Sequence, residues 1–581
     1  MNVKVLLLAL LVLVAGCGVS KKPVASVPTA SDATPVEPVP GKPAVADGKV
    51  ANEASAPTSL PAPPPMQPPP ATQRMAASKG LASSRYMMAP MPVPPMQPMP
   101  SDINRENYAH RDSNPVQLAS EQPVSTFGID VDTGAYTNVR RMLNAGRLPP
   151  ADAVRAEEFI NYFDYGYAPP ADREQPFSVT TELASAPWNA QRQLLLVGIQ
   201  GYRVPAAQIP ASNLVFLIDT SGSMDEPDKL PLLKASLKQL VRELRPRDRV
   251  AIVTYAGSAG VALPSTAGDR HATINAAIDS LGAGGSTNGG AGIELAYAQA
   301  TQGFIQGGVN RVILATDGDF NVGTVDQAAL KSIVENHRKS GVALTTLGFG
   351  EGNYNDAMAV MLADAGNGSH HYIDSLAEGR RVLVEAMSAT LLTIAKDVKI
   401  QLEFNPAQVQ EYRLIGYEKR LLKREDFNND AVDAGEIGAG ANVTAIYEIT
   451  PTGSAAARID PLRYGARPTP TAGGDELAFL RLRYKLPGQS ASRLIERPIA
   501  ARAEAHPSER LRFAAAVAAF ADALRGGKYL DGYGYAQIAQ LANGARGSDA
   551  DGYRAGFVQL VKLADGLATH GHDDAGDTAA R

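Results

Sequence analysis

The sequence predicts a doubly wound α/β domain with a mostly parallel sheet over residues 211–390. A mixed N-terminal segment and a C-terminal region, β-rich and then helical, are expected to flank it. Two observations carry this prediction. The continuous apolar runs Leu214–Ile218 and Val312–Ala315 are typical of strands buried on both faces of a sheet. Amphipathic helices such as residues 228–244 alternate with these runs, and this alternation favours a doubly wound sheet.

The chain begins with a segment typical of secretory signals. A lysine precedes the apolar run Val5–Val14, which is shorter than the roughly 20 apolar residues of a membrane-spanning helix. The ending Val14-Ala15-Gly16-Cys17 resembles the bacterial lipobox, in which the signal is cut before the cysteine and the cysteine carries lipid. We therefore expect residues 1–17 to be a lipoprotein signal peptide, with Cys17 as the lipid-bearing residue that anchors the chain in a bacterial envelope membrane. Gly18 favours the outer membrane by the same resemblance.

A proline-rich stretch follows the signal. Residues 23–100 hold 20 of the chain's 42 prolines and almost no aromatic residues. Sequence of this composition cannot bury enough apolar area to offset its ordering entropy. Residues 18–122 are therefore predicted to be a disordered tether.

The flanks of the α/β domain differ from it in pattern. Residues 123–210 are a mixed segment. Residues 395–500 contain alternating apolar positions that predict strands, for example Val398, Ile400 and Leu402. Alanine-rich sequence near 508–567 predicts helices. We expect residues 395–567 to form one C-terminal domain, with 568–581 as a tail.

The composition excludes several function classes. The chain has 581 residues, a formal charge of −5 and a single cysteine. One cysteine excludes an internal disulfide framework and a cysteine-based zinc site. A slightly acidic balance argues against nucleic-acid binding. The sequence also lacks HExxH, GxxxxGK[ST] and GxSxG, the signatures of zinc proteases, P-loop NTPases and serine hydrolases.

Within the α/β domain the remaining elements follow in order. Strands are expected at 249–256, 342–349 and 369–373, with a short edge strand at 260–266. Helices are expected near 325–339, 355–364 and 376–390. Ligands of such sheets bind at the carboxyl ends of the strands.

Oxygen-bearing side chains lie at three of these strand or loop ends. Asp219, Ser221 and Ser223 follow the first strand, Thr287 lies in a loop before a helix, and Asp317 follows the strand at 312–315. Carboxylates and hydroxyls are hard donors that suit Mg²⁺, Mn²⁺ or Ca²⁺ and do not suit zinc or copper. We therefore predict one divalent-cation site at the carboxyl edge of the sheet, with Mg²⁺ as the preferred ion.

These five residues resemble the metal-ion-dependent adhesion site (MIDAS) of the von Willebrand factor type A (VWA) domain, in which DxSxS is followed by a distant Thr and a distant Asp. The resemblance implies a VWA fold and a site where a protein partner's Asp or Glu completes the coordination of the ion. Ser125–Thr133, Asn161–Tyr165 and Arg481–Lys485 also resemble parts of a family of bacterial VWA lipoproteins, so the likeness covers about 123–565.

Three functions remain open on this evidence. The first is a membrane-anchored, non-enzymatic protein that binds a partner through the cation. The second is a structural envelope scaffold in which the metal only stabilises the fold. The third is a hydrolase with its site in residues 395–565, although no motif there supports it. Asp130–Gly134 is similar to the nucleophile motif of haloacid-dehalogenase phosphatases, but its threonine stands one position too early.

Overall fold

The computed structural model describes most of the chain from Arg105 onward. The described ranges are 105–171, 174–285, 289–318, 327–386, 391–460 and 474–578. Cys17, the signal peptide and most of the predicted tether lie outside the described residues.

The central α/β domain contains a six-stranded sheet with strand order β10-β9-β8-β5-β6-β7. Its strands are β5 (Ser212–Asp219), β6 (Arg249–Tyr255), β7 (Ala259–Ala267), β8 (Val309–Thr316), β9 (Ala343–Gly348) and β10 (His370–Tyr372). All neighbours pair in parallel except β7, which is an antiparallel edge strand. The chain adds strands on one side of β5 and then on the other, so the order reverses between β5 and β8. The predicted doubly wound sheet is confirmed.

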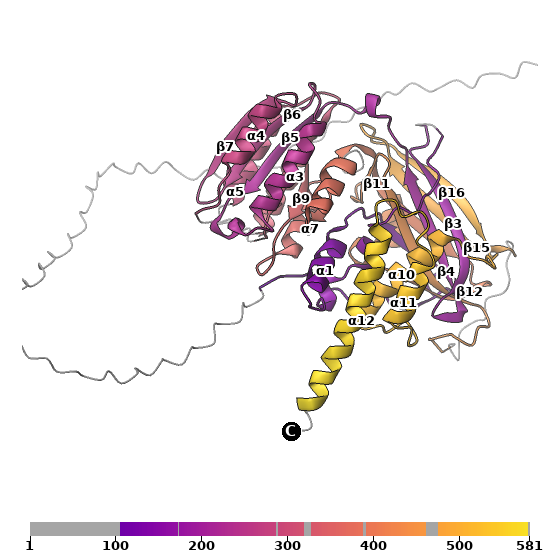
Figure 1. The fold of residues 1–581 in the computed structure, drawn as a ribbon. Helices are drawn as coiled ribbons and strands as arrows, with labels where there is room; N and C mark the ends of the chain where they lie inside the picture. The colour runs from indigo at the N-terminus through magenta and orange to yellow at the C-terminus, as the bar shows by residue number, and fades with distance from the viewer. Residues whose placement is uncertain are drawn as a thin grey trace, which may run out of the picture. The chain divides into compact units, whose positions relative to one another are not determined.

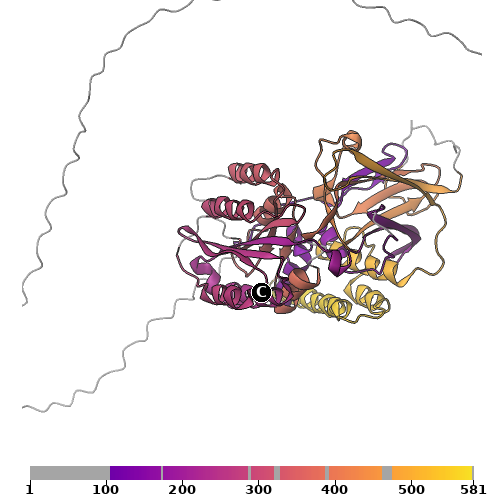
Figure 2. The same ribbon diagram turned by 90° about the horizontal axis from the view of Figure 1, so that it is seen from above.

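Helices cover both faces of this sheet, as Figure 2 shows. Every residue of β5 is buried, and its alternate side chains enter two separate cores. One core contains Phe216 with α3 (Leu230–Glu243) and α4 (His271–Ser280). The other contains Leu217 with α5, α6 and α7. The helix bounds are α5 (Gly289–Gln302), α6 (Gln327–Arg338), α7 (Asp356–Ala365) and α8 (Leu376–Arg380).

The two flanks form a single β-sandwich, with the α/β domain inserted between them in sequence. One sheet has the order β1-β12-β14-β4-β3, and the other has β13-β11-β15-β16 with β2 paired to β11. The strands of the N-terminal flank are β1 (Gln117–Leu118), β2 (Val124–Gly128), β3 (Phe177–Ala186) and β4 (Asn189–Gly201). Those of the C-terminal flank are β11 (Thr393–Phe404), β12 (Val409–Ile415), β13 (Ile437–Gly438), β14 (Asn442–Pro451), β15 (Glu476–Lys485) and β16 (Ser492–Ala500). Neither flank can bury its apolar side chains alone, because one core is lined by both.

Helices from both flanks cover the outer face of the first sheet. Alternate residues of β4 such as Leu194 and Leu196 join a core with the alanine-rich helix α10 and its neighbours (Figure 1). These helices are α1 (Gly134–Asn144), α2 (Ala156–Ile160), α10 (Glu509–Leu524), α11 (Tyr535–Asn543) and α12 (Tyr553–Thr578). The small alanine side chains let α10 pack closely, and Ala514 to Ala516 are almost completely buried.

Contacts with the folded part begin at Arg105, earlier than the composition predicts. Asn107 bridges to Asn355 in parallel, and β1 pairs with β12. Residues 105–122 contain few large apolar side chains. Backbone hydrogen bonds and single polar side chains such as Asn114 hold them to the rest of the fold, and a composition argument cannot detect such contacts.

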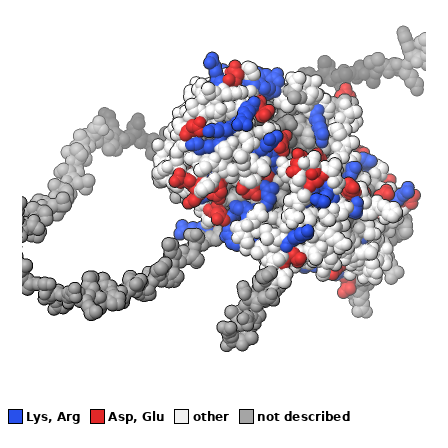
Figure 3. Space-filling view, in the orientation of Figure 1, with Lys and Arg blue, Asp and Glu red and all other residues white. Residues whose placement is uncertain are grey.

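Charged residues of both signs are mixed on the face shown in Figure 3, with no extended basic region there. Among the described residues, no helix combines the length and the apolar content needed to cross a membrane.

Candidate metal centre

Asp219 is the last residue of β5, and donors from three places fix its carboxylate. Oδ1 accepts a hydrogen bond from the backbone N–H of Ser221 at 2.9 Å. Oδ2 accepts from the hydroxyl of Tyr255 at 3.1 Å and from that of Thr316 at 3.3 Å. The side chain is buried, which raises the pKa of Asp219 to about 6 against the opposing effect of the Ser221 hydrogen bonds. The carboxylate is thus held at the end of three adjacent strands.

The two serines follow Asp219 in a tight turn. The hydroxyl oxygens of Ser221 and Ser223 are 3.1 Å apart. The loop that leads to α5 lies directly on this turn, because Gly222 donates its backbone N–H to the carbonyl of Gly285 at 3.2 Å. Thr287, the predicted ligand from that loop, lies outside the described residues.

Asp317 follows β8, beside β5, and has no exposed surface. Its Oδ2 accepts from the ammonium of Lys229 at 3.1 Å and from the amide of Asn353 at 3.5 Å. The next residue, Gly318, has a φ of +89°. A side chain there would overlap the backbone N of Asn355, so the close approach of these two loops requires glycine.

The structure therefore brings Asp219, Ser221, Ser223 and Asp317 to one edge of the sheet. The donors are two carboxylates and two hydroxyls, which are the hard oxygens that Mg²⁺, Mn²⁺ and Ca²⁺ prefer. This donor set fits the predicted ion. Lys229, which pairs with one of the carboxylates, did not follow from the sequence, because a lysine before an amphipathic helix usually reaches solvent.

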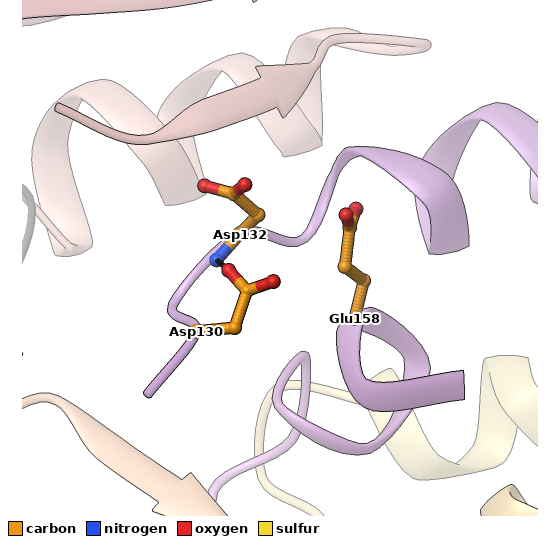
Figure 4. Close-up of side chains that lie close together, drawn as sticks. All are labelled: Asp130, Asp132 and Glu158. Carbon is orange, nitrogen blue, oxygen red and sulfur yellow. Dashed lines mark hydrogen bonds between the residues drawn. The ribbon is translucent and has the colours of Figure 1, made fainter. Parts of the chain in front are cut away.

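A second group of carboxylates lies in the N-terminal flank. One oxygen from each of Asp130, Asp132 and Glu158 falls within 4.8 Å of the others, and all three residues are buried (Figure 4). The ammonium of Lys419 lies 2.9, 2.7 and 3.1 Å from these carboxylates. The lysine supplies the positive charge that such a cluster needs, so the cluster is a buried ion-pair network.

This network also joins the flanks to the central domain. Arg155 binds Asp356 of α7 at 2.6 Å and also contacts Glu158. Asp132 accepts a hydrogen bond from the backbone N–H of His370 at 2.7 Å. A cavity of about 460 Å³ lies beside these residues, and several of its cations pair with carboxylates, for example Arg420 with Asp364 at 2.6 Å.

Comparison with protein families gives three matches along the chain. Residues 213–381 match the von Willebrand factor type A domain, and residues 102–196 match a second model described as von Willebrand factor. Residues 389–567 match the family described as uncharacterized protein YfbK, C-terminal. The matches cover the central domain and both flanks.

Individual proteins extend the comparison. The uncharacterized protein YfbK of Escherichia coli is 54% identical over 469 residues, which cover 79% of this chain and 81% of that protein. The uncharacterized protein sll0103 of Synechocystis is 30% identical over 32% of this chain and 43% of its own length. A solved structure, von Willebrand factor type A from Catenulispora acidiphila, aligns with 67% of this chain and 89% of its own at 17% identity and a TM-score of 0.38.

Proposed function

The chain belongs to the YfbK family of proteins with a VWA domain, and from this premise we propose that it binds a protein partner through a divalent cation at the carboxyl edge of its central sheet. The observation that carries the proposal is the convergence of Asp219, Ser221, Ser223 and Asp317 from two adjacent strands. This convergence is the physical requirement for a shared ion.

The residues take distinct roles in this proposal. Ser221, Ser223 and Thr287 would hold the ion with their hydroxyls, and Asp219 and Asp317 would balance its charge. When bound, the ion supplies an electropositive centre that attracts a carboxylate from outside the chain. Tyr255 and Thr316 keep Asp219 oriented before any ion arrives, so little reorganisation is needed.

We infer a binding role and no catalysis. The groups that meet at this edge are oxygen ligands, each already held by hydrogen bonds or ion pairs in the described residues. Among the described residues, the hydroxyls of Ser221 and Ser223 hydrogen-bond to each other, and neither is paired with a general base as nucleophilic catalysis would require.

The envelope location is part of the same proposal. Its support is the lipobox-like sequence ending at Cys17 and the proline-rich stretch after it. A lipid on Cys17 would anchor the chain in the bacterial envelope, in the outer membrane by the identity of Gly18. The stretch would let the folded part reach a partner away from the membrane surface.

A scaffold role is the second candidate, and one observation favours it. Buried ion pairs such as Arg155 with Asp356 fasten the central domain to the flanks. In a scaffold, the ion would stabilise the fold without contacting a partner.

The experiment that separates the two candidates is crosslinking and affinity capture from cell envelopes, in Mg²⁺ or in EDTA. The wild type is compared with Asp219→Ala and with Asp279→Ala, a matched control that removes an exposed carboxylate from α4. We expect partner capture to fall more than tenfold in EDTA and in Asp219→Ala, a loss of about 1.4 kcal/mol or more, and to persist in Asp279→Ala. Capture that survives both treatments would favour the scaffold.

A further inference from the structure

We propose that Lys229 acts as a built-in cation of the metal site. Its ammonium weakens the binding of a bare divalent ion and makes tight binding depend on a carboxylate from outside. This inference rests on the proposed function, since it takes Asp219 and Asp317 as the residues that hold the ion.

The first support is the position of the lysine. Lys229 directly precedes α3, and its Nζ lies 3.1 Å from Oδ2 of Asp317. The lysine side chain is 7% exposed and the aspartate 0% exposed. A charge this well shielded from water acts strongly on its neighbours, because the surrounding protein screens it far less than water would.

The second support is that the fold makes room for this side chain. Gly350, in the loop after β9, has a φ of +71°, and a Cβ at this position would overlap the stem of Lys229. The same loop supplies Asn353, whose amide reaches the Oδ2 that Lys229 contacts. The lysine is therefore packed into one place and does not sample solvent as a surface lysine does.

The third support is a count of charges. Asp219 and Asp317 carry two negative charges, and Lys229 returns one positive charge. A bound divalent ion then leaves the site with one net positive charge, whereas the same site without the lysine would be neutral. One incoming carboxylate restores neutrality. The lysine thus favours an acidic ligand over water at the site.

A comparison with the buried cluster of Asp130, Asp132 and Glu158 supports the proposed role of Lys229. Lys419 lies within 3.1 Å of all three carboxylates of its cluster, and Arg155 and Arg420 also pair with carboxylates there, so three cations match three carboxylates. By contrast, at the sheet edge Lys229 pairs with Asp317, and Asp219 is hydrogen-bonded to hydroxyls and a backbone N–H. Lys229 compensates only part of the site's charge and leaves a need for a further cation.

The test is a Mn²⁺ titration of the purified full chain, followed by calorimetry or by the electron paramagnetic resonance of free Mn²⁺. Lys229→Met removes the charge and keeps an unbranched side chain, while Lys229→Arg keeps the charge. Lys234→Met is the matched control, because this lysine of α3 donates to the backbone carbonyls of Asp279 and Leu281. We expect Lys229→Met to bind Mn²⁺ at least tenfold more tightly than the wild type. The other two variants should stay within threefold of the wild type.

A second arm adds acetate at constant ionic strength. Acetate should tighten Mn²⁺ binding to the wild type by at least threefold and change Lys229→Met less, since the variant site is already neutral. If Lys229→Met is unstable without metal, Lys229→Gln replaces it with the same expected direction.

The outcomes separate the two proposals. If Lys229→Met binds Mn²⁺ no more tightly than the wild type while Asp219→Ala loses binding, the role of the lysine is overturned and the metal site stands. Equal acetate effects in both proteins overturn the demand for a carboxylate. If neither the wild type nor Lys229→Met binds Mn²⁺, both proposals are overturned.

Discussion

The oxygen atoms at the edge of the sheet are oriented by residues that would not themselves contact an ion. Tyr255 comes from β6 and Thr316 from β8, yet both donate to the same oxygen of Asp219. Such donors favour the ionised form of a buried carboxylate and fix its direction, as the outer partners of metal ligands do. The quality of the site thus depends on hydroxyls outside the recognised motif.

Glu157 gives a test of buried charge that is independent of the metal site. It is 1% exposed, and no described residue donates a hydrogen bond to its Oε2. Burial, with the nearby carboxylate of Glu418, raises the pKa of Glu157 to about 8. Folding therefore favours the protonated form.

We predict that Glu157→Gln stabilises the protein at pH 8 and leaves its stability nearly unchanged at pH 4.5. The wild type loses stability as pH rises from about 4.3 toward 8, because the unfolded chain releases this proton first and glutamine has none to release. The expected gain at pH 8 is about 1 kcal/mol or more in denaturant unfolding. Glu121→Gln, at an exposed site, is the control. A difference between variant and wild type that does not change with pH would refute the assignment.

The meeting of Asp219, Ser221, Ser223 and Asp317 at one edge of the sheet was predictable, because these residues follow strand ends in a known spacing. Two local patterns predict them, DxSxS after the apolar run Leu214–Ile218 and an aspartate, Asp317, after the apolar run Val312–Ala315. Lys229, Tyr255 and Asn353 were not predictable, since their roles depend on which strands and loops become neighbours in space.

At the scale of elements, glycines control how the loops at the sheet edge meet. Gly307 and Gly318 lie on either side of β8, and both have positive φ values, +69° and +89°. A Cβ at Gly307 would meet nothing within 4 Å, whereas one at Gly318 would overlap the backbone of the loop after β9. An alanine at either position would adopt a strained left-handed backbone conformation, but only at Gly318 would its Cβ also overlap other atoms.

We predict that Gly307→Ala costs about 1 kcal/mol of unfolding free energy, the usual cost of a left-handed alanine. Gly318→Ala should cost roughly 2–4 kcal/mol, because an overpacking cost of about 1–3 kcal/mol is added. Chemical denaturation measures both variants. Equal costs would show that the loop after β9 moves away freely.

The loop after β9 also has a partner outside the α/β domain. Residues 105–107, here called the strap, donate backbone N–H groups from Arg105 to Gly352 at 2.8 Å and from Asn107 to Tyr354 at 3.0 Å. Glu106 accepts from the backbone of Gly352 at 3.1 Å and from Arg141 at 2.8 Å. The strap thus ties the N-terminal flank to the loop that carries Gly350 and Asn353.

We predict that Glu106→Ala speeds hydrogen exchange of the amides in 349–355 by at least threefold. The variant loses the hydrogen bond to Gly352 and the ion pair with Arg141, which itself binds Glu351 of this loop. Exchange followed by mass spectrometry measures this, with Glu121→Ala as the control. Unchanged exchange in the loop would mean that the strap does not restrain it.

Local periodicity explains which elements were predictable. The strands and helices of the central domain are predicted by apolar repeats, and each repeat involves residues only a few positions apart in the sequence. The pairing of β2 with β11 joins residues such as Thr126 and Gln401. No local pattern reports a partner at such a separation, so the shared sandwich of the two flanks could not be predicted.

At the scale of the whole molecule, the central domain is inserted in one sandwich and fastened to it by charge. Arg140 of α1 binds Asp374 at 2.6 Å and Glu378 at 2.9 Å, and Arg155 binds Asp356. Both ends of the inserted domain return to strands of the same sandwich.

We predict that a lipid on Cys17 anchors the whole chain in a membrane. We expect Cys17→Ser to release the protein from the membrane fraction or to leave its signal uncut, because the lipid attachment atom is lost. Fractionation with mass determination of the N-terminus measures this. A variant that matures and fractionates as the wild type does would rule out Cys17 as the anchor.

The most direct test of the central claim is an anomalous difference map from crystals of the folded chain soaked in Mn²⁺. We predict one strong peak bounded by the side chains of Asp219, Ser221, Ser223 and Asp317, and no such peak in crystals of Asp219→Ala. A wild-type map with no peak there, or with its strongest peak among Asp130, Asp132 and Glu158, would contradict the account.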